Sequence, residues 1–165
     1  MEQPVIEVKN LVKVYGKRST AFTALKKINL EIQKGESVAI IGKSGSGKST
    51  LMHLLALLDR PTEGNVIVDG IDSTKLKTKQ LNTLRNDDFG FVFQQFFMNP
   101  QDTVLENVTL PLKIAGKRRK ERRELAMKAL RTVGLADRAK FKANDLSGGQ
   151  KQRVCIARAI VNNPK

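Results

Sequence analysis

The sequence of 165 residues predicts an α/β fold in which a phosphate-binding loop joins a buried strand to a helix. Three observations lead to this prediction. Short β-rich runs dominate the first forty residues, strand and helix patterns alternate after them, and a glycine- and serine-rich loop follows the most apolar run. The composition, 40% hydrophobic and 28% charged, is typical of an ordinary globular domain with one core.

The N-terminal part predicts four strands before the loop. Three of them are short and alternating or β-rich, at residues 5–8, 11–15 and 28–32. The fourth, at residues 38–41, contains only apolar residues, which is typical of a buried strand.

A helix at residues 48–58 is predicted directly after the loop at 42–47. It must end before the Asp59-Arg60-Pro61 turn, because the residue before a proline disfavours the helical conformation. Strand, loop and helix therefore follow one another without interruption.

The middle of the chain predicts a strand at residues 64–69, a helix at about 75–85 and an apolar strand at 89–93. Asp69 imitates the aspartate that ends a strand in a Walker B motif. Asp69-Gly70 is better explained as a hairpin turn, because this dipeptide accepts the backbone angles of such a turn.

Two helices are predicted in the last third. The first follows the basic run at 117–123 and ends at Gly134. Its apolar residues fall on one face, and they are Leu125, Ala129, Leu130 and Val133. The second spans residues 148–161, with Pro164 just beyond it.

The glycine-rich loop fits the pattern G-x-x-x-x-G-K-[ST] after a strand and before a helix, which is the required context. Its backbone N–H groups can point at phosphate oxygens, Lys48 can reach the β- and γ-phosphates, and the Ser49 hydroxyl can bind Mg²⁺. The predicted nucleotide-binding residues are Gly42, Lys43, Ser44, Gly45, Ser46, Gly47, Lys48, Ser49 and Thr50. The motif predicts a P-loop protein that binds ATP or another nucleoside triphosphate, but it does not choose between a kinase, a GTPase, a nucleic-acid motor and a transporter ATPase.

A second anion-binding geometry is predicted at the start of the last helix, where the sequence reads LSGGQ. Ser147 is a natural N-cap, and Gly148 and Gly149 expose backbone N–H groups at the positive end of the helix. One nucleotide held at Lys48 leaves no obvious role for this site within the same subunit. Taken alone, the motif could equally be a capped helix start.

Taken together, these motifs make the sequence similar to the ABC ATPases. The segment LSGGQKQRVCIARAI resembles the signature of that family, and Tyr15, the phosphate loop and Gln94 precede it in the family's order and spacing. The resemblance covers residues 5–165. The segments PTEGNVIVDG, FGFVFQQF and ENVTLPLKIAG resemble in particular the subfamily that powers lipoprotein release, macrolide export and antimicrobial-peptide export or resistance.

The resemblance implies a P-loop NTPase fold with an N-terminal antiparallel β lobe, a helical signature subdomain and an incomplete parallel sheet. The chain, residues 1–165, would be the N-terminal portion of one nucleotide-binding domain. Its core with the phosphate loop would be residues 1–93, its helical subdomain about 94–150, and its return to the core 151–165.

The resemblance also implies a dimer in which two cassettes pack head to tail. Each ATP would lie between the phosphate loop of one cassette and Ser147, Gly148, Gly149 and Gln150 of the other. Tyr15 would stack on adenine, although a lone tyrosine on a strand is often only packing.

Gln94 matches the family's glutamine that contacts Mg²⁺ and the attacking water and relays the nucleotide state to the permease. Lys48 and Gln94 would therefore be the catalytic residues, and Ser49 and Gln94 the Mg²⁺ ligands. The apolar segment at 96–100 would form part of the groove that receives a cytoplasmic helix of the integral membrane permease; the alternative is a buried hydrophobic anchor.

The family's Walker B strand, catalytic glutamate, D-loop and switch histidine have no counterpart in the 165 residues. His53 lies five residues after Lys48 and is better explained as a packed or solvent-facing helical residue. We therefore expect this polypeptide to turn over ATP poorly, and our hypothesis is that it is a fragment or a truncated gene product.

The formal net charge of +14 can attract phosphates, nucleic acids or anionic headgroups. Much of it lies at 117–123, without interleaved base-stacking aromatics, which favours a solvated helix face and no specific nucleic-acid partner. The alternatives to a transport ATPase are a soluble ABC-type protein acting on nucleic acid or ribosomes, and a nonhydrolytic nucleotide-binding remnant.

The sequence also indicates in which compartment of the cell the protein is expected. It contains no run of roughly 20 apolar residues and no signal-peptide pattern, so a cytoplasmic protein is expected, held at the inner face of the membrane by the permease. The single cysteine, Cys155, lies in an apolar stretch, and we expect a buried, unreactive thiol.

Overall fold

The computed structural model describes residues 3–165. Met1 and Glu2 belong to the predicted core region 1–93 and lie outside the described residues. The chain divides into two compact units, Met1–Asn82 and Thr83–Lys165. A helix, α2 (Thr78–Asp88), contains the boundary between them.

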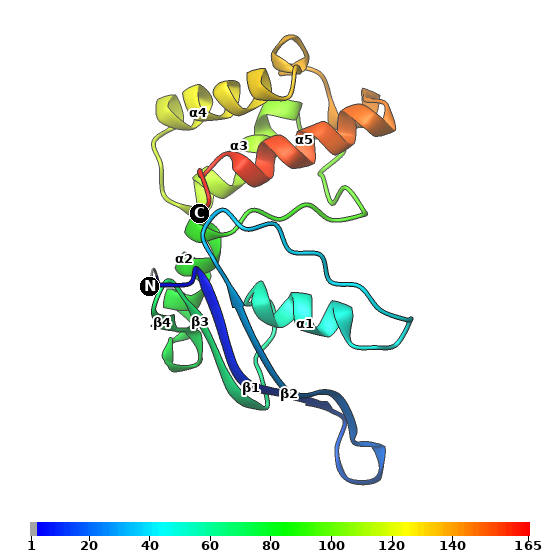
Figure 1. Cartoon of the computed structure of the whole chain (residues 1–165). Coiled ribbons are helices and arrows are strands. Elements are labelled where there is room, and N and C mark those ends of the chain that lie inside the picture. The colour runs from blue at the N-terminus through cyan, green and yellow to red at the C-terminus, as the bar shows by residue number, and fades with distance from the viewer. Residues whose placement is uncertain (1–2) are drawn as a thin grey trace. The chain divides into compact units, whose positions relative to one another are not determined.

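The first unit is built on a four-stranded antiparallel sheet of order β2-β1-β3-β4 (Figure 1). The strands are β1 (Ile6–Tyr15), β2 (Phe22–Ile32), β3 (Glu63–Val68) and β4 (Ile71–Asp72). Strand β1 joins the two strands predicted at 5–8 and 11–15. Asn10 adopts a left-handed φ of 48° between them, where the register with β2 shifts, so a bulge replaces the expected break.

The predicted hairpin turn at Asp69-Gly70 is confirmed. Both residues have positive φ, 50° and 77°, and Val68 pairs with Ile71 across the turn. Two consecutive positive φ angles are what a two-residue type I′ connection requires. Asp69 is therefore a turn residue.

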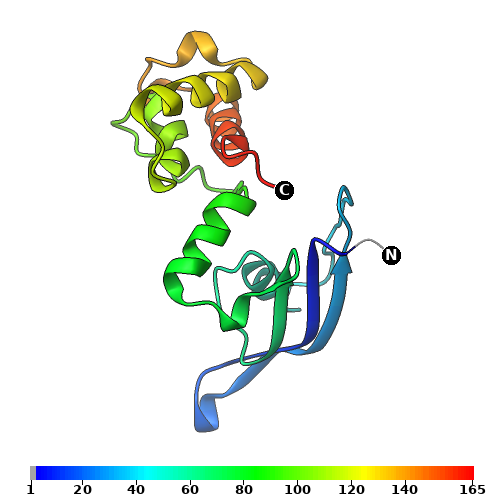
Figure 2. The same ribbon diagram turned by 90° about the vertical axis from the view of Figure 1, so that its left-hand side faces the viewer.

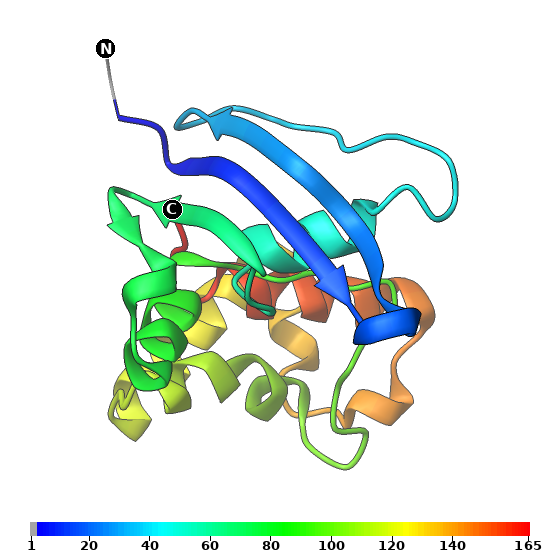
Figure 3. The ribbon, with the colours of Figure 1, turned by 90° about the horizontal axis from the view of Figure 1, so that it is seen from below.

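Helix α1 (Lys48–Leu55) lies along one face of the sheet (Figures 2 and 3). Its buried residues Leu54 and Leu55 join the core of the unit, together with the strand residues Val8, Leu11, Leu25, Val66 and Val68.

Helix α1 ends three residues before the predicted position. Leu57 adopts a left-handed φ of 56°. The Leu58 N–H donates to the His53 carbonyl at 2.8 Å and the Leu57 N–H donates to the Leu54 carbonyl at 3.1 Å. These two bonds form a Schellman motif. The motif ends the helix at Leu55, whereas the boundary at 58 was predicted from the position of Pro61.

The two apolar strands predicted at 38–41 and 89–93 are not strands in the structure. Both segments are extended, and among residues 3–165 neither pairs with a neighbour (Figure 3). Ile41 is 89% exposed. A strand is stabilised by the ladder that an adjacent strand supplies, so an apolar run alone does not create one. The sheet that the structure describes is antiparallel throughout.

The second unit is a cluster of three helices around one apolar core (Figure 2). They are α3 (Val104–Ile114), α4 (Arg119–Thr132) and α5 (Gly148–Ile160). The fully buried core residues are Val104, Val108, Leu112, Ala126, Leu130, Val154 and Ala157. Helices α4 and α5 were predicted, and α3 was not.

Short 3-10 helices complete the secondary structure. They are η1 (Arg18–Thr20), η2 (Ser73–Lys75), η3 (Ala136–Arg138) and η4 (Ala143–Asp145). Within residues 3–165, no helix has the length and apolar content needed to cross a membrane.

Candidate functional site

The glycine-rich loop at 42–47 runs directly into the start of α1. Gly47 is the N-cap of this helix and has a φ of 89°. A Cβ at this position would lie 2.7 Å from the Ala24 carbonyl oxygen of β2 and 3.0 Å from the Leu25 side chain. Only glycine satisfies both the backbone conformation and the space that β2 leaves.

The Lys48 side chain folds back over the loop. Its Nζ donates to the carbonyl oxygens of Gly42 at 2.9 Å and Lys43 at 2.7 Å. An ammonium group has three N–H donors, so one donor remains for an external acceptor. Lys48 therefore closes the loop and still offers a hydrogen bond to an anion.

The N-terminus of α1 differs from those of α3 and α5. No side chain caps it, and no acidic residue lies in its first turn. Helices α3 and α5 instead begin with complete capping boxes. The uncapped positive end of α1, next to Lys43, Lys48 and the exposed Ser49, fits a phosphate group, because unsatisfied N–H donors and the helix dipole both favour an anion.

Tyr15 ends β1 with its side chain 40% exposed. Its hydroxyl donates to Asp59 Oδ2 at 3.1 Å. The Lys13 Nζ lies 2.8 Å from the same oxygen and 4.9 Å from the centre of the Tyr15 ring. Lys13, Tyr15 and Asp59 thus form one cluster, although sequence reasoning singled out only Tyr15.

The electrostatics of this cluster favour an ionised Asp59. Partial burial acts to raise the pKa of Asp59, but it is outweighed by the hydrogen bond from Lys13, the Arg60 backbone N–H, the charge of Lys13 and the Tyr15 hydroxyl. The pKa is therefore lower than that of an ordinary aspartate.

In the second unit, Ser147 caps α5 as predicted. Its Oγ accepts from the Gln150 N–H at 3.3 Å, and the Ser147 N–H donates to Gln150 Oε1 at 2.9 Å. Gly148 and Gly149 are exposed, and a Cβ at either position would have no neighbour within 4 Å. The first turn of α5 therefore presents an open backbone surface.

Gln94 lies exposed in a bend of the chain, and the residues after it are tied to α5. The Arg158 guanidinium donates to the carbonyls of Phe96 at 3.0 Å and Phe97 at 2.8 Å. The Cys155 thiol donates to the Phe96 carbonyl at 3.1 Å. One face of α5, four residues long, thus holds the segment that follows Gln94.

Cys155 is buried, as predicted. Burial raises the pKa of its thiol, and the charge of Arg158 offsets only part of this effect. A protonated thiol is a weak nucleophile, which agrees with the expected lack of reactivity.

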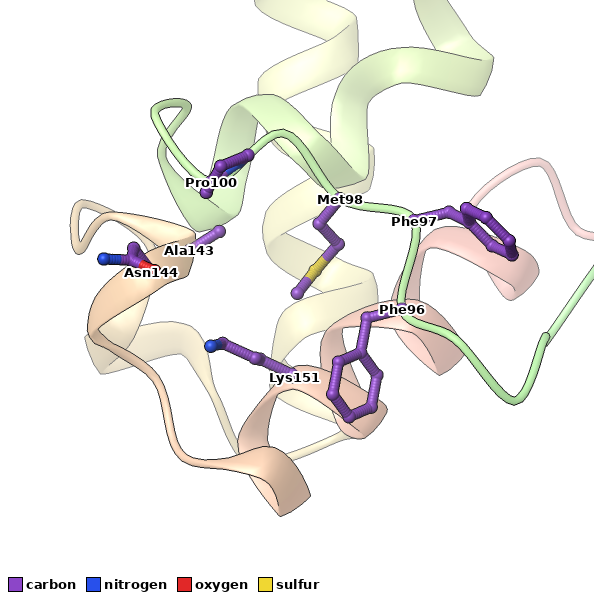
Figure 4. A pocket seen from close by; sticks show the side chains of 7 residues that line it. All are labelled: Phe96, Phe97, Met98, Pro100, Ala143, Asn144 and Lys151. Carbon is purple, nitrogen blue, oxygen red and sulfur yellow. The ribbon is translucent and has the colours of Figure 1, made fainter.

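The apolar segment at 96–100 lines a pocket of about 250 Å³ (Figure 4). Met98 and Lys151 extend toward its middle, whereas the Phe97 ring, 65% exposed, points away. The other lining residues are Phe96, Pro100, Ala143 and Asn144. The segment is therefore partly open to solvent, and a fully buried anchor does not describe it.

The predicted site residues fall into two groups. The loop residues and Tyr15 lie in the first unit, and Gln94 and residues 147–150 lie in the second. His53 is exposed on α1. No group of three His, Cys, Asp or Glu side chains within residues 3–165 could hold a metal ion.

Comparisons with known proteins agree with one another. The sequence model of a family described as "ABC transporter" matches residues 25–165. "Uncharacterized ABC transporter ATP-binding protein YknY" of Bacillus subtilis is 50% identical over 161 residues, which are 98% of this chain and 70% of the relative. "Lipoprotein-releasing system ATP-binding protein LolD" of Geobacter metallireducens is 47% identical over 161 residues, 98% of this chain and 72% of the relative.

A solved structure is also similar. It is the "Dimeric structure of a post-hydrolysis state of the ATP-binding cassette MJ0796 bound to ADP and Pi", from Methanocaldococcus jannaschii. The TM-score is 0.85 at 46% identity, over 96% of this chain and 70% of that chain.

Proposed function

The chain belongs to the ABC transporter family as an ATP-binding cassette, and from this membership we propose that it is the motor subunit that powers export or release of a substrate through an integral membrane permease. The family resemblance and the P-loop NTPase fold predicted from the sequence are confirmed. The similarity to a lipoprotein-releasing subunit supports release or export as the direction of transport.

The uncapped start of α1 beneath Lys48 is the observation that carries this proposal. We assign residues 42–50 to the phosphates of ATP and Ser49 to Mg²⁺. When bound, ATP supplies the phosphoanhydride bond whose hydrolysis drives transport. The Lys48 ammonium uses its remaining donor for a phosphate oxygen, and the backbone N–H groups of the first turn donate to the same anion.

Gln94 is proposed as the residue that contacts Mg²⁺ and orients the attacking water. Its exposure at a bend supports this role, because the side-chain amide is free to both accept and donate hydrogen bonds. Arg158 and Cys155 hold the following carbonyls, so Gln94 begins a segment whose far end is fixed to α5.

A second cassette is proposed as the partner at the start of α5. Ser147, Gly148, Gly149 and Gln150 would contact the nucleotide held by the other subunit, because open glycine backbone at a helix N-terminus suits a phosphate group. The dimeric structure of MJ0796 supports this arrangement.

The pocket at 96–100 is proposed as the docking site of the permease, which would place the cassette at the cytoplasmic face of the membrane. An exposed aromatic residue beside a partly apolar hollow is typical of a protein interface. We also propose that residues 1–93 act as the nucleotide-binding core, about 94–150 as the helical subdomain and 151–165 as the return to the core.

Replacing Lys48 tests the proposed nucleotide site. A hydrogen bond to a charged group contributes about 1.5–3 kcal/mol, so Lys48→Ala is expected to weaken MgATP binding about 10- to 100-fold. Isothermal titration calorimetry of the 165-residue chain measures this directly. Lys34→Ala, which removes the same charge from an exposed position of the same unit, is the matched control. Unchanged affinity of the Lys48 variant would refute the assignment.

A further inference from the structure

The exposed Tyr15 side chain is held by two neighbours, Lys13 and Asp59. Both carboxylate oxygens of Asp59 are engaged, because Oδ1 accepts the Arg60 N–H at 2.7 Å while Oδ2 accepts from Lys13 and from the Tyr15 hydroxyl. The carboxylate is therefore held in one orientation. The far end of the Tyr15 ring is fixed to it.

Lys13 fixes a face of the same ring. Its side chain is only 12% exposed, and its Nζ donates to the Arg60 carbonyl at 2.7 Å in addition to Asp59. An ammonium over an aromatic face is attracted to that face. Because the ammonium occupies this side, a planar ligand can stack only on the opposite side of the Tyr15 ring.

The position of the cluster relative to the phosphate loop is set by the sheet. Gly47 lies against Ala24 and Leu25 of β2, and Leu25 pairs with Lys13 of β1. Tyr15 is two residues further along β1, which is roughly 7 Å at the usual rise of a strand. The ring is thus within the span of a nucleotide whose phosphates lie at the start of α1.

Asp59 reaches Tyr15 because of the way in which α1 ends. The Schellman motif at Leu57 and Leu58 turns the chain back toward the sheet immediately before Asp59. The helix that begins at the phosphate loop therefore also delivers the carboxylate that holds the ring.

We propose that Asp59 and Lys13 are positioning residues, which hold the Tyr15 ring as a one-sided platform for the base of the nucleotide. This inference rests on the proposed function, in which Tyr15 contacts adenine. A ring that is already ordered loses less conformational freedom when the base stacks on it, so the cluster raises affinity for the base without touching it.

The test separates base binding from phosphate binding. Affinities for MgATP and for magnesium tripolyphosphate are measured by calorimetry in the wild type, Asp59→Ala, Lys13→Met and Tyr15→Phe. Each variant is expected to bind MgATP about 3- to 10-fold more weakly, the size of an aromatic contact, and to bind tripolyphosphate as the wild type does. Asp59→Asn keeps an acceptor oxygen and is expected to recover part of the loss.

A second readout follows the ring itself. The chain has one tyrosine and no tryptophan, so its tyrosine fluorescence comes from Tyr15 alone. Loss of Asp59 or Lys13 is expected to lower the anisotropy of this emission, because the ring becomes free to move. Tyr15→Phe removes the only tyrosine and is therefore measured by calorimetry alone. It is the mildest variant there, because it removes only the hydroxyl.

The outcomes are distinguishable. Wild-type affinities in all variants, with unchanged anisotropy, would overturn the positioning role while leaving the nucleotide site intact. An equal loss of MgATP and tripolyphosphate affinity would also overturn it, because the substitutions would then act on the phosphate loop. A wild-type chain that binds neither ligand would refute the proposed function and the inference with it.

Discussion

At the scale of single residues, two glycines of the phosphate loop share a strained backbone conformation but differ in the space around them. Gly45 and Gly47 have similar positive φ angles, 78° and 89°. Space around Gly45 is open, whereas Gly47 lies against the Ala24 carbonyl. Any side chain at either position is strained, but only at Gly47 must it also displace β2.

Gly47→Ala is therefore expected to lower the free energy of unfolding more than Gly45→Ala does. The additional cost of the contact should be about 1–3 kcal/mol, the usual range for overpacking. Urea denaturation followed by circular dichroism measures both variants. Equal losses would show that β2 moves away at no cost.

The residues that act locally in the site could be predicted, and those that act over long sequence separations could not. Lys48 and the Ser147 cap are defined by spacing within one loop or one helical turn. Lys13 and Asp59 are 46 positions apart and meet only because α1 returns the chain to β1. No local pattern encodes such a meeting.

At the scale of elements, α5 acts as a brace for the segment after Gln94. Arg158 bonds two consecutive carbonyls of that segment, at Phe96 and Phe97. Arg153, on the same helix, instead donates to the Val133 carbonyl at 3.3 Å. Arg153 is therefore a matched control for Arg158, because it lies on the same helix and bonds a different segment.

Arg158→Met is expected to increase amide hydrogen exchange in residues 94–99 by about tenfold or more, because bonds from a charged donor contribute about 1.5–3 kcal/mol. Mass spectrometry of a peptide that covers these residues measures the change. Arg153→Met should leave the same peptide unchanged. If both variants exchange alike, the segment is held by something other than Arg158.

Helix α3 carries a local start signal and, further along, a residue that contradicts it. Thr103 and Glu106 form a capping box, in which the Thr103 N–H donates to Glu106 at 2.7 Å and the Glu106 N–H to Thr103 at 3.1 Å. The sequence T-x-x-E indicates such a start. Pro111 inside the helix hides the pattern, because proline usually ends one.

The apolar runs at 38–41 and 89–93 are the opposite case, in which a local pattern predicts an element that the structure does not contain. Their composition is typical of buried strands, yet a ladder depends on a partner that lies elsewhere in the chain. In the second run, Phe89, Phe91 and Phe93 stack on one another at ring separations of 6.0 and 5.9 Å. Side-chain packing there takes the place of strand pairing.

At the scale of the whole molecule, the order of motifs predicted the fold better than the secondary-structure patterns did. Tyr15, the phosphate loop, Gln94 and residues 146–150 occur in the order found in ABC ATPases, and the similarity to solved cassettes confirms that fold. Patterns of apolar residues alone predicted strands at 38–41 and 89–93, and neither belongs to the sheet that residues 3–165 form. The incomplete parallel sheet that the resemblance implied is not found among these residues either.

The net charge of +14 makes nonspecific attraction to nucleic acid an expected property of the chain. Binding to duplex DNA should not depend on sequence. For about 6–10 phosphate contacts its affinity should fall by about 10³- to 10⁵-fold between roughly 50 and 200 mM salt. Fluorescence anisotropy with two unrelated duplexes tests both points. A shallow salt dependence with a sequence preference would favour the alternative of a protein that acts on nucleic acid.

The extended segments that carry Val38, Ile41, Val92 and Phe93 determine how the 165-residue chain is expected to behave in concentrated solution. Within residues 3–165 neither segment belongs to the sheet, and an extended apolar segment without a partner strand is a template for the same segment of another molecule. Self-assembly through them depends on concentration and not on unfolding. A concentrated sample should therefore age through fibrous aggregation while the helices and the antiparallel sheet of each molecule stay folded.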